Sequence, residues 1–151
     1  MDIIQPVPGD FCLKCRGCCR FSSRESVWSV HLLEEEKTRL RGMSVEEDPG
    51  QGNFVCVFLG RSDNKCGIYP DRPFECRMYP FVFDRKEDKF FLALDLNCAY
   101  VKENISQPEF KDRVRAVIKM SGSPESREIL KNNPQLFQDY DGVLDLIELK
   151  I

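Results

Sequence analysis

Four of the eight cysteines of this 151-residue chain stand in one short stretch, Cys12-Leu13-Lys14-Cys15-Arg16-Gly17-Cys18-Cys19. Thiols this dense are typical of soft ligands for zinc or for an iron–sulfur cluster, and are unusual as core packing. In a helix the four cysteines would share one face about 120° wide, and a loop around Gly17 would equally allow them to meet. Either geometry makes the sulfurs converge, so the stretch predicts a fold built around a bound metal.

The other four cysteines follow at wider spacing, and we expect them to fold back onto the first group. Zinc takes four thiolates in a tetrahedron, whereas a C-x-x-C-x-x-C run such as Cys12, Cys15 and Cys18 is also typical of a 4Fe-4S cluster, with Cys76 or Cys19 as its fourth ligand. Eight thiols allow two four-thiolate sites, or one site with free or catalytic thiols beside it. The candidate metal ligands are Cys12, Cys15, Cys18, Cys19, Cys56, Cys66, Cys76 and Cys98.

Cations stand beside both groups of cysteines. Lys14, Arg16 and Arg20 flank the first group, while Arg72 and Arg77 bracket Cys76. Four thiolates around a zinc ion or a cluster leave a net negative charge, and neighbouring cations lower thiol pKa values and favour the ligand form. We therefore predict that Arg72 and Arg77 belong to the cofactor-binding site.

The composition limits the partners and the location. The chain has 22 basic and 25 acidic residues, a net charge of −3, which gives no electrostatic footprint for nucleic acid. There is no signal peptide and no apolar stretch near the ~18 residues that span a bilayer, so we expect a cytoplasmic protein that has no membrane partner and keeps its thiols reduced. Disulfides are the weaker alternative, because the adjacent Cys18 and Cys19 suit paired bridges poorly.

Two familiar kinds of site find no support in the sequence. His31 is the only histidine, and with eight cysteines available we do not expect it to be a ligand. There is no G-x-x-x-x-G-K-[ST] or G-x-G-x-x-G motif for a nucleotide. The expected partners are a metal ion and, as an open alternative, a partner protein.

The pattern of apolar residues and turn signals predicts a small α+β domain with short helices and a β-hairpin or small antiparallel sheet around the metal centre. It predicts strand-forming residues at 26–30, a helix at 32–41, an exposed loop at 43–52, a buried strand at 54–59 and a short helix at 73–76. A hairpin joins 81–83 to 90–94, helices begin near Ser106 and Ser123, and 142–151 favours a strand. We assign one domain, 1–151, with a metal-binding region at 12–98 and a helical C-terminal extension at 99–151.

A second ordered motif, I-Y-x-x-R-P-x-x-C-R-x-Y-P-F, runs from Ile68 to Phe81. Together with C-x-x-C-x-x-C-C, Cys56 and Cys66, it resembles the CxxCxxCC cysteine-cluster family, the YkgJ-type zinc- or iron-chelating domains, over residues 12–98. The resemblance implies that all eight cysteines bind metal. A related cysteine region occurs in flagellin lysine methylases, which resemble users of an iron–sulfur cluster and S-adenosylmethionine but are considerably longer.

Three functions follow from these observations. The first is a metal-binding protein that chelates zinc or iron, with an iron–sulfur cluster included, and serves in metal handling, electron transfer or as an accessory factor. The second is an iron–sulfur enzyme that uses S-adenosylmethionine to modify a protein or small molecule. The third is a zinc-stapled interaction module. The sequence identifies no catalytic residue.

Overall fold

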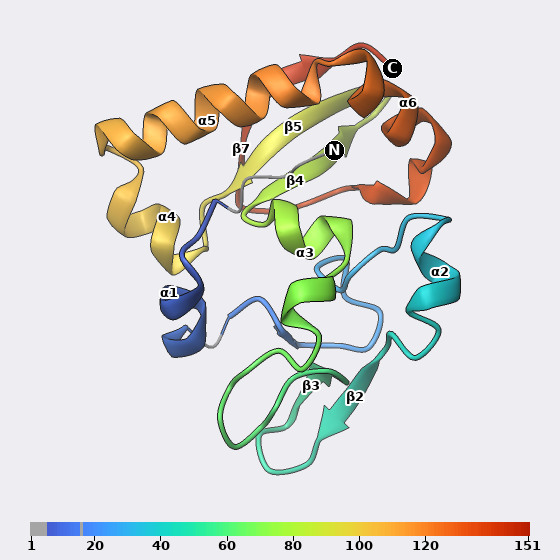
Figure 1. The fold of residues 1–151 in the computed structure, drawn as a ribbon, viewed down its shortest axis with the longest axis vertical. Helices are drawn as coiled ribbons and strands as arrows, with labels where there is room; N and C mark the ends of the chain where they lie inside the picture. The colour runs from blue at the N-terminus through green and yellow to red at the C-terminus, as the bar shows by residue number, and fades with distance from the viewer. Residues whose placement is uncertain (1–5, 16) are drawn as a thin grey trace.

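The computed structural model describes residues 6–15 and 17–151, which form two small sheets and six α-helices. The first sheet has the strand order β1-β3-β2, with β1 at Arg20–Phe21, β3 at Asn53–Cys56 and β2 at Val45–Asp48. The second has the order β6-β4-β5-β7, with β6 at Phe137–Gln138, β4 at Phe81–Lys86, β5 at Lys89–Asp95 and β7 at Val143–Leu149. Figure 1 shows the four-stranded sheet above and the three-stranded sheet below, with α3 (Phe74–Met78) between them. The predicted α+β class is confirmed.

The four-stranded sheet is built around the predicted hairpin. Strands β4 and β5 pair antiparallel from Phe81↔Leu94 to Lys86↔Lys89, and Glu87 has a positive φ of 54° in the turn between them. The end of the chain completes this sheet, because β6 pairs with β4 in parallel and β7 pairs with β5 antiparallel. The segment after residue 99 therefore contributes two strands to the sheet as well as helices.

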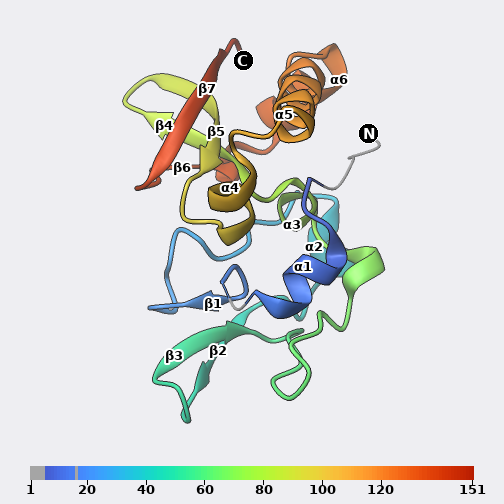
Figure 2. The same ribbon diagram turned by 90° about the vertical axis from the view of Figure 1, so that its left-hand side faces the viewer.

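Helices cover one face of this sheet. Helices α4 (Ala99–Asn104), α5 (Pro108–Ser121) and α6 (Pro124–Asn132) follow β5, and Figure 2 shows α5 and α6 on one side of the strands. Alternate residues of the hairpin, Phe81, Phe83, Leu92 and Leu94, are at most 2 % exposed and form the main core against Phe110 and other helical residues. A period of two on the strands and an apolar stripe on the helices produce this core.

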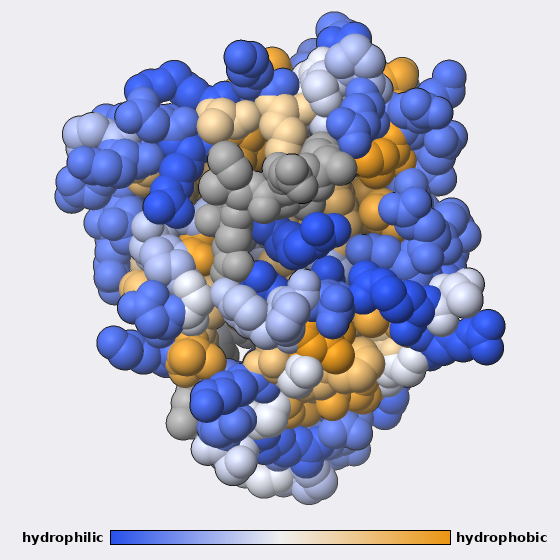
Figure 3. Space-filling view, in the orientation of Figure 1, coloured by the Kyte–Doolittle hydropathy of each residue, from blue (hydrophilic) through white to orange (hydrophobic). Residues whose placement is uncertain are grey.

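The N-terminal half is less regular. Helix α1 (Gly9–Lys14) and helix α2 (Glu36–Arg39) are short, and the 3₁₀ helix η1 (Tyr69–Asp71) leads into α3; a second 3₁₀ helix, η2, spans Pro134–Leu136. Hydrophobic residues gather on the lower half of the face in Figure 3, at the level of the three-stranded sheet. None of the described helices is long and apolar enough to cross a membrane.

Several predicted elements are confirmed. The hairpin, the short helix after Pro73, the helices beginning at Pro108 and Pro124, and the final strand are all present. Ser123 is the N-cap of α6 and accepts a hydrogen bond from the Ser126 backbone N–H, as expected of a serine before a helix.

Three predictions for the N-terminal half need correction. Residues 26–30 form turns in place of a strand, because the Ser26 hydroxyl accepts the Trp28 N–H and the Ser29 hydroxyl donates to the Ser26 carbonyl. The predicted loop at 43–52 contains β2, a charged edge strand that pairs with β3. The helix predicted over 32–41 is shortened to α2, and the Glu36 side chain accepts the Leu33 N–H just before it.

Candidate metal centre

Seven of the eight cysteines line one cavity of about 380 Å³. Its wall is contributed by both sheets, by the loop after α1, by the segment from Phe58 to Arg72 and by α3. The lining cysteines are Cys12, Cys15, Cys18, Cys19, Cys56, Cys66 and Cys76. The folding back that was expected for the later cysteines thus occurs for Cys56, Cys66 and Cys76.

The loop that carries the first cysteines is held by Asn64. Helix α1 ends at Cys15, which is extended, and the chain turns towards β1. The Asn64 side-chain amide donates to the carbonyls of Leu13 (2.8 Å) and Cys15 (2.9 Å), while its oxygen accepts from Arg20 Nη1 (2.8 Å). Asn64 has a φ of 57°, a left-handed conformation that asparagine tolerates better than most residues. In the sequence Asn64 is only one residue of a turn. Its role in positioning the first cysteines could not be predicted from the sequence.

Backbone pairing brings the later cysteines to the same place. The Cys56 N–H donates to the Cys19 carbonyl (3.0 Å), extending the pairing of β1 with β3. An isolated bridge joins Leu59 to Cys66, and the Gly67 N–H donates to the Phe58 carbonyl (2.8 Å). Three segments that are distant in sequence therefore present their thiols to one space.

The lining thiols influence one another's ionisation. Burial raises the pKa of Cys12 to about 11, with a further rise from the charge of Cys18 and a partial reduction from Arg72. Burial also raises the pKa of Cys76, and the charges of Glu75, Cys18, Cys56 and Cys66 act in the same direction. These thiols are therefore protonated at neutral pH unless a bound cation offsets the cost of their charge.

Cys18 occupies a central position among these thiols. Its side chain is exposed at the cavity, and its hydrogen bond with the Cys19 thiol raises the pKa of Cys18. The charge of Cys18 also acts on Cys12, Cys56 and Cys76. Cys18 is thus coupled electrostatically to both the early and the late cysteines.

Cys98 differs from the other seven cysteines. It is buried, it stands at the N-cap of α4, and it does not line the cavity. Burial raises its pKa, which hydrogen bonds from the backbone N–H groups of Val101 and Tyr100 partly lower. Its charge also contributes to the raised pKa of Cys12.

The predicted arginines occupy different positions. Arg72 lines the cavity, its guanidinium stacks 3.7 Å from the centroid of the Tyr69 ring, and its Nε donates to the Tyr69 carbonyl (2.9 Å). Arg77 does not line the cavity, and its buried Nε has no hydrogen-bond partner in the described part of the chain. Of the other flanking cations, Arg20 lines the cavity, Lys14 does not, and Arg16 lies outside the described residues.

The cavity wall also includes residues other than cysteine. Val82, Asp95 and Tyr140 from the four-stranded sheet and its connections line it together with Trp28 and Glu75. Tyr140 is 5 % exposed and Asp95 is 3 % exposed. Trp28 is the kind of residue usually found in a core, and nothing in the sequence joins it to Tyr140, which is more than a hundred residues away.

The donor set fits zinc or iron by its chemistry. All eight cysteines are free thiols, and soft thiolate ligands are those that zinc and iron–sulfur centres use. Within residues 6–15 and 17–151, no three His, Cys, Asp or Glu side chains already form a group arranged to hold a metal ion. The thiols share a cavity without a closed coordination sphere, so ligation requires them to lose protons and draw together.

Comparison with known proteins identifies the family. Residues 11–99, more than half of the chain, match the CxxCxxCC family, which is described as a "putative zinc- or iron-chelating domain". No curated protein and no solved structure matches the chain. The matched region includes every cysteine and ends just after Cys98. The chain belongs to the CxxCxxCC family.

Proposed function

We propose that this protein binds zinc or iron through the cysteines of the cavity. The observation that carries the proposal is the convergence of seven free thiols, drawn from four separate segments of the chain, on one cavity. Membership of a family described as chelating zinc or iron supports the same assignment.

The cysteines divide into two groups in this proposal. The first group consists of Cys18, Cys56, Cys66 and Cys76. The charges of Cys18 and Cys66 raise the pKa values of both Cys56 and Cys76. The group has four thiols, the number that a tetrahedral zinc ion or a 4Fe-4S cluster requires. Cys12 has Cys15 and Cys98 as charged neighbours, and these three with Cys19 form the second half of the donor set. We expect the first group to hold metal more tightly, because all four of its thiols line the cavity.

The two arginines complete the proposed centre. Arg72 lies beside Cys12 and lowers the pKa of that thiol, so it would help to stabilise a negatively charged thiolate centre. Arg77 follows Cys76 directly in the chain, and its unpartnered Nε is available as a second counter-charge from outside the cavity.

Metal analysis tests this proposal. The protein is purified without oxygen, its visible spectrum is recorded, and zinc, iron and acid-labile sulfide are counted per chain. Stoichiometric zinc in colourless protein would assign a zinc centre, and iron with sulfide in brown protein would assign an iron–sulfur centre. Absence of both metals after growth in metal-supplemented medium would refute chelation.

Cysteine variants test the division into two groups. Cys66→Ser and Cys76→Ser each remove one of the four proposed thiols and should lose the tighter metal. Cys98→Ser is the matched control, because Cys98 does not line the cavity, and it should keep that metal. Equal metal loss in all three variants would contradict the division while leaving chelation itself intact.

A second candidate function is an iron–sulfur enzyme that uses S-adenosylmethionine. The cavity volume favours this candidate, because about 380 Å³ exceeds what a metal ion alone needs. Equilibrium dialysis with S-adenosylmethionine tests it, since no saturable binding to the iron-loaded protein would reject the enzyme and leave metal handling, electron transfer or an accessory role.

A further inference from the structure

The cavity extends beyond the thiols. About 380 Å³ corresponds to roughly a dozen water molecules at ~30 Å³ each, and pockets for small organic ligands begin near ~300 Å³. A metal ion held by four sulfurs fills only the space between those sulfurs. We use the name aromatic compartment for the part of the cavity wall that is formed by Trp28, Glu75, Tyr79, Val82, Asp95 and Tyr140.

The Glu75 carboxylate can accept a hydrogen bond from a ligand in this compartment. Its Oε2 accepts the His31 backbone N–H at 2.6 Å, which fixes the side chain. Its Oε1 lies 3.4 Å from both His31 Nδ1 and the Tyr140 hydroxyl. Because both of these contacts are long, Oε1 can accept a further, shorter hydrogen bond.

Asp95, the second carboxylate of the compartment, also accepts from one tyrosine hydroxyl and one backbone N–H. Asp95 Oδ2 accepts from the Tyr79 hydroxyl (2.6 Å), and its Oδ1 accepts the Asn97 backbone N–H (2.8 Å). Both tyrosines thus direct their single O–H proton to a carboxylate and keep only lone pairs for a ligand. The polar side chains named here therefore accept hydrogen bonds and have no hydroxyl proton to spare.

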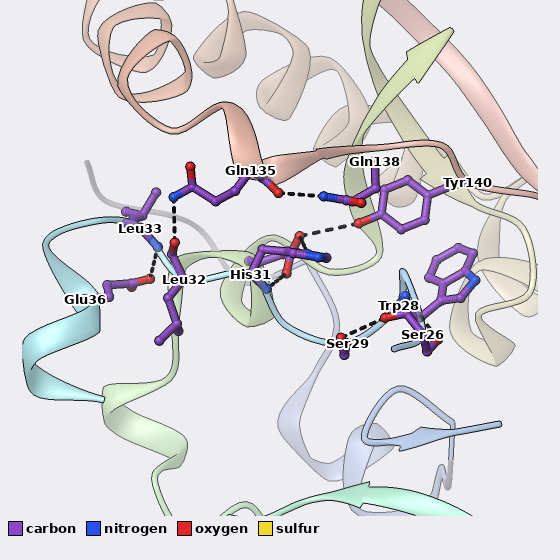
Figure 4. Close-up of polar contacts among 11 residues, drawn as sticks. Ser26, Trp28, Ser29, His31, Leu32, Leu33, Glu36, Gln135, Gln138 and Tyr140 are labelled. Atoms are coloured by element: carbon purple, nitrogen blue, oxygen red, sulfur yellow. Dashed lines mark hydrogen bonds and ion pairs between the residues drawn. The ribbon is translucent and has the colours of Figure 1, made fainter. Parts of the chain in front are cut away.

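Aromatic rings form the rest of the compartment wall. The Trp28 and Tyr140 ring centroids lie 4.7 Å apart with the planes inclined at 49°, and Figure 4 shows the indole beside the phenol. Val82, 3 % exposed, packs in the same small cluster. Aromatic faces attract cations, and an alkyl chain loses its contact with water against such surfaces.

We infer that the aromatic compartment binds an organic amine cation, with its ammonium group towards Glu75 and Asp95 and its alkyl part against Trp28 and Val82. Two buried carboxylates, each beside a tyrosine whose O–H proton is already directed to it, and aromatic faces together select a positively charged N–H donor. The ligand would lie beside the thiols in the same cavity. The inference goes beyond chelation, because it assigns an organic ligand to residues of the cavity wall that are not cysteines.

The single tryptophan makes the inference directly testable, since Trp28 lies in the compartment itself. The full-length protein with its metal is titrated with n-butylammonium, n-butanol and butyrate, which share an alkyl chain and differ in charge. Tryptophan fluorescence and calorimetry should show saturable binding of n-butylammonium, at least tenfold weaker binding of n-butanol and no binding of butyrate.

Variants locate the binding site. Glu75→Gln keeps an oxygen that can accept the His31 N–H but removes the charge, and it should weaken n-butylammonium binding at least tenfold without changing metal content. Glu128→Gln, on the exposed surface of α6, is the matched control and should bind as the wild type does. Trp28→Phe, measured by calorimetry, supplies a second variant if Glu75→Gln fails to fold, and it should weaken binding severalfold.

Three results would overturn the inference: no saturable response to n-butylammonium, butyrate binding as tightly as n-butylammonium, or unchanged affinity in a folded Glu75→Gln variant. Metal content is measured in the same samples, and the titration is repeated on metal-free protein. A chelation failure therefore appears as missing metal, whereas failure of this inference appears as missing amine binding with the metal present.

Discussion

At the residue scale, the cysteines depend on a few polar side chains that are not ligands. Asn64 is the clearest case, because its amide bridges the loop that carries Cys15 and the turn that precedes Cys66. One side chain makes three hydrogen bonds to groups 44 to 51 residues away in the sequence. The position of the first cysteine group therefore depends on a residue outside the cysteine motif.

Replacement of Asn64 should separate its two roles. Asn64→Gly keeps the left-handed backbone but removes the amide, and we expect a loss of about 1–2 kcal/mol from the free energy of unfolding. Asn64→Ala removes the amide and also strains the backbone, which adds about 1 kcal/mol. Urea denaturation of the metal-free proteins measures both. Equal stability of wild type and Asn64→Gly would show that the amide contacts contribute nothing.

Tyr140 should make the stability of the protein depend on alkaline pH. Burial, followed by the charge of Glu75, raises the pKa of Tyr140 in the folded state, whereas the unfolded chain has a value near 10. Above pH ~10 the unfolded state loses a proton that the folded state keeps. The free energy of unfolding should therefore fall with rising pH, by up to about 1.4 kcal/mol per pH unit for this group.

Tyr140→Phe provides the comparison. The stability advantage of wild type over this variant should be constant below pH ~9 and should shrink between about pH 10 and 11.5. The thiols titrate in both proteins, so their effect cancels in the difference. Urea unfolding across this pH range measures it, and a pH-independent difference would contradict a buried, neutral Tyr140.

At the scale of elements, one buried carboxylate joins two short helices. Glu36 is 5 % exposed, and its two oxygens accept the backbone N–H of Leu33 (3.1 Å) and that of Phe74 (2.7 Å). Helices of four and five residues are too short to be stable alone. Glu36 connects the start of α2 to the start of α3, and α3 carries Cys76.

The neighbouring glutamates allow a matched test of this connection. Glu36→Ala leaves two N–H groups without their acceptor in a buried position, and we expect a loss of about 2–4 kcal/mol. Glu35→Ala alters an exposed residue of the same Glu-Glu-Glu run and should change stability by less than about 0.5 kcal/mol. Urea denaturation compares the two variants, and similar losses in both would show that Glu36 does not join the helices.

The sequence predicts elements well where local signals agree. The hairpin, α5, α6 and β7 have clear periodicity, and the cap at Ser123 is present. The three glutamates at 34–36 look alike in sequence, and no local signal distinguishes one from another. Only the packing of α2 against α3 makes Glu36 a buried acceptor while Glu34 and Glu35 stay exposed.

At the scale of the molecule, the two sheets differ in how much core supports them. The four-stranded sheet packs its buried residues into one large cluster with the helices. The three-stranded sheet has strands of two, four and four residues, with Phe21 and Val55 as its buried hydrophobic residues. A centre bound by thiols beside the smaller sheet would therefore add most to the stability of that part.

Removal of metal should reveal this difference. After treatment with a chelator, amide hydrogens of β1, β2 and β3 should exchange much faster, while those of β4 and β5 should keep most of their protection. Hydrogen exchange followed by mass spectrometry measures both regions in one sample. Protein that was already free of metal before the same chelator was added is the control for effects of the chelator itself. An equal loss of protection in both sheets would contradict the prediction.

The sequence by itself determined the chemistry of this protein and its locally encoded elements. The identity and spacing of the cysteines identify a thiol-rich centre, and hydrophobic periodicity predicts the hairpin and the C-terminal helices. These properties need only neighbouring residues, so they can be read without the fold.

The tertiary structure decided which side chains share the cavity. It placed seven cysteines on the cavity wall and left Cys98 out of it. It also made Asn64 and Glu36 into links between segments and set Trp28 against Tyr140. The long-range contacts made by Glu36, Asn64 and Trp28 join residues that are 38 to 112 positions apart in the sequence. No local pattern encodes such pairings, because they arise only when the packing of both sheets closes the chain on itself.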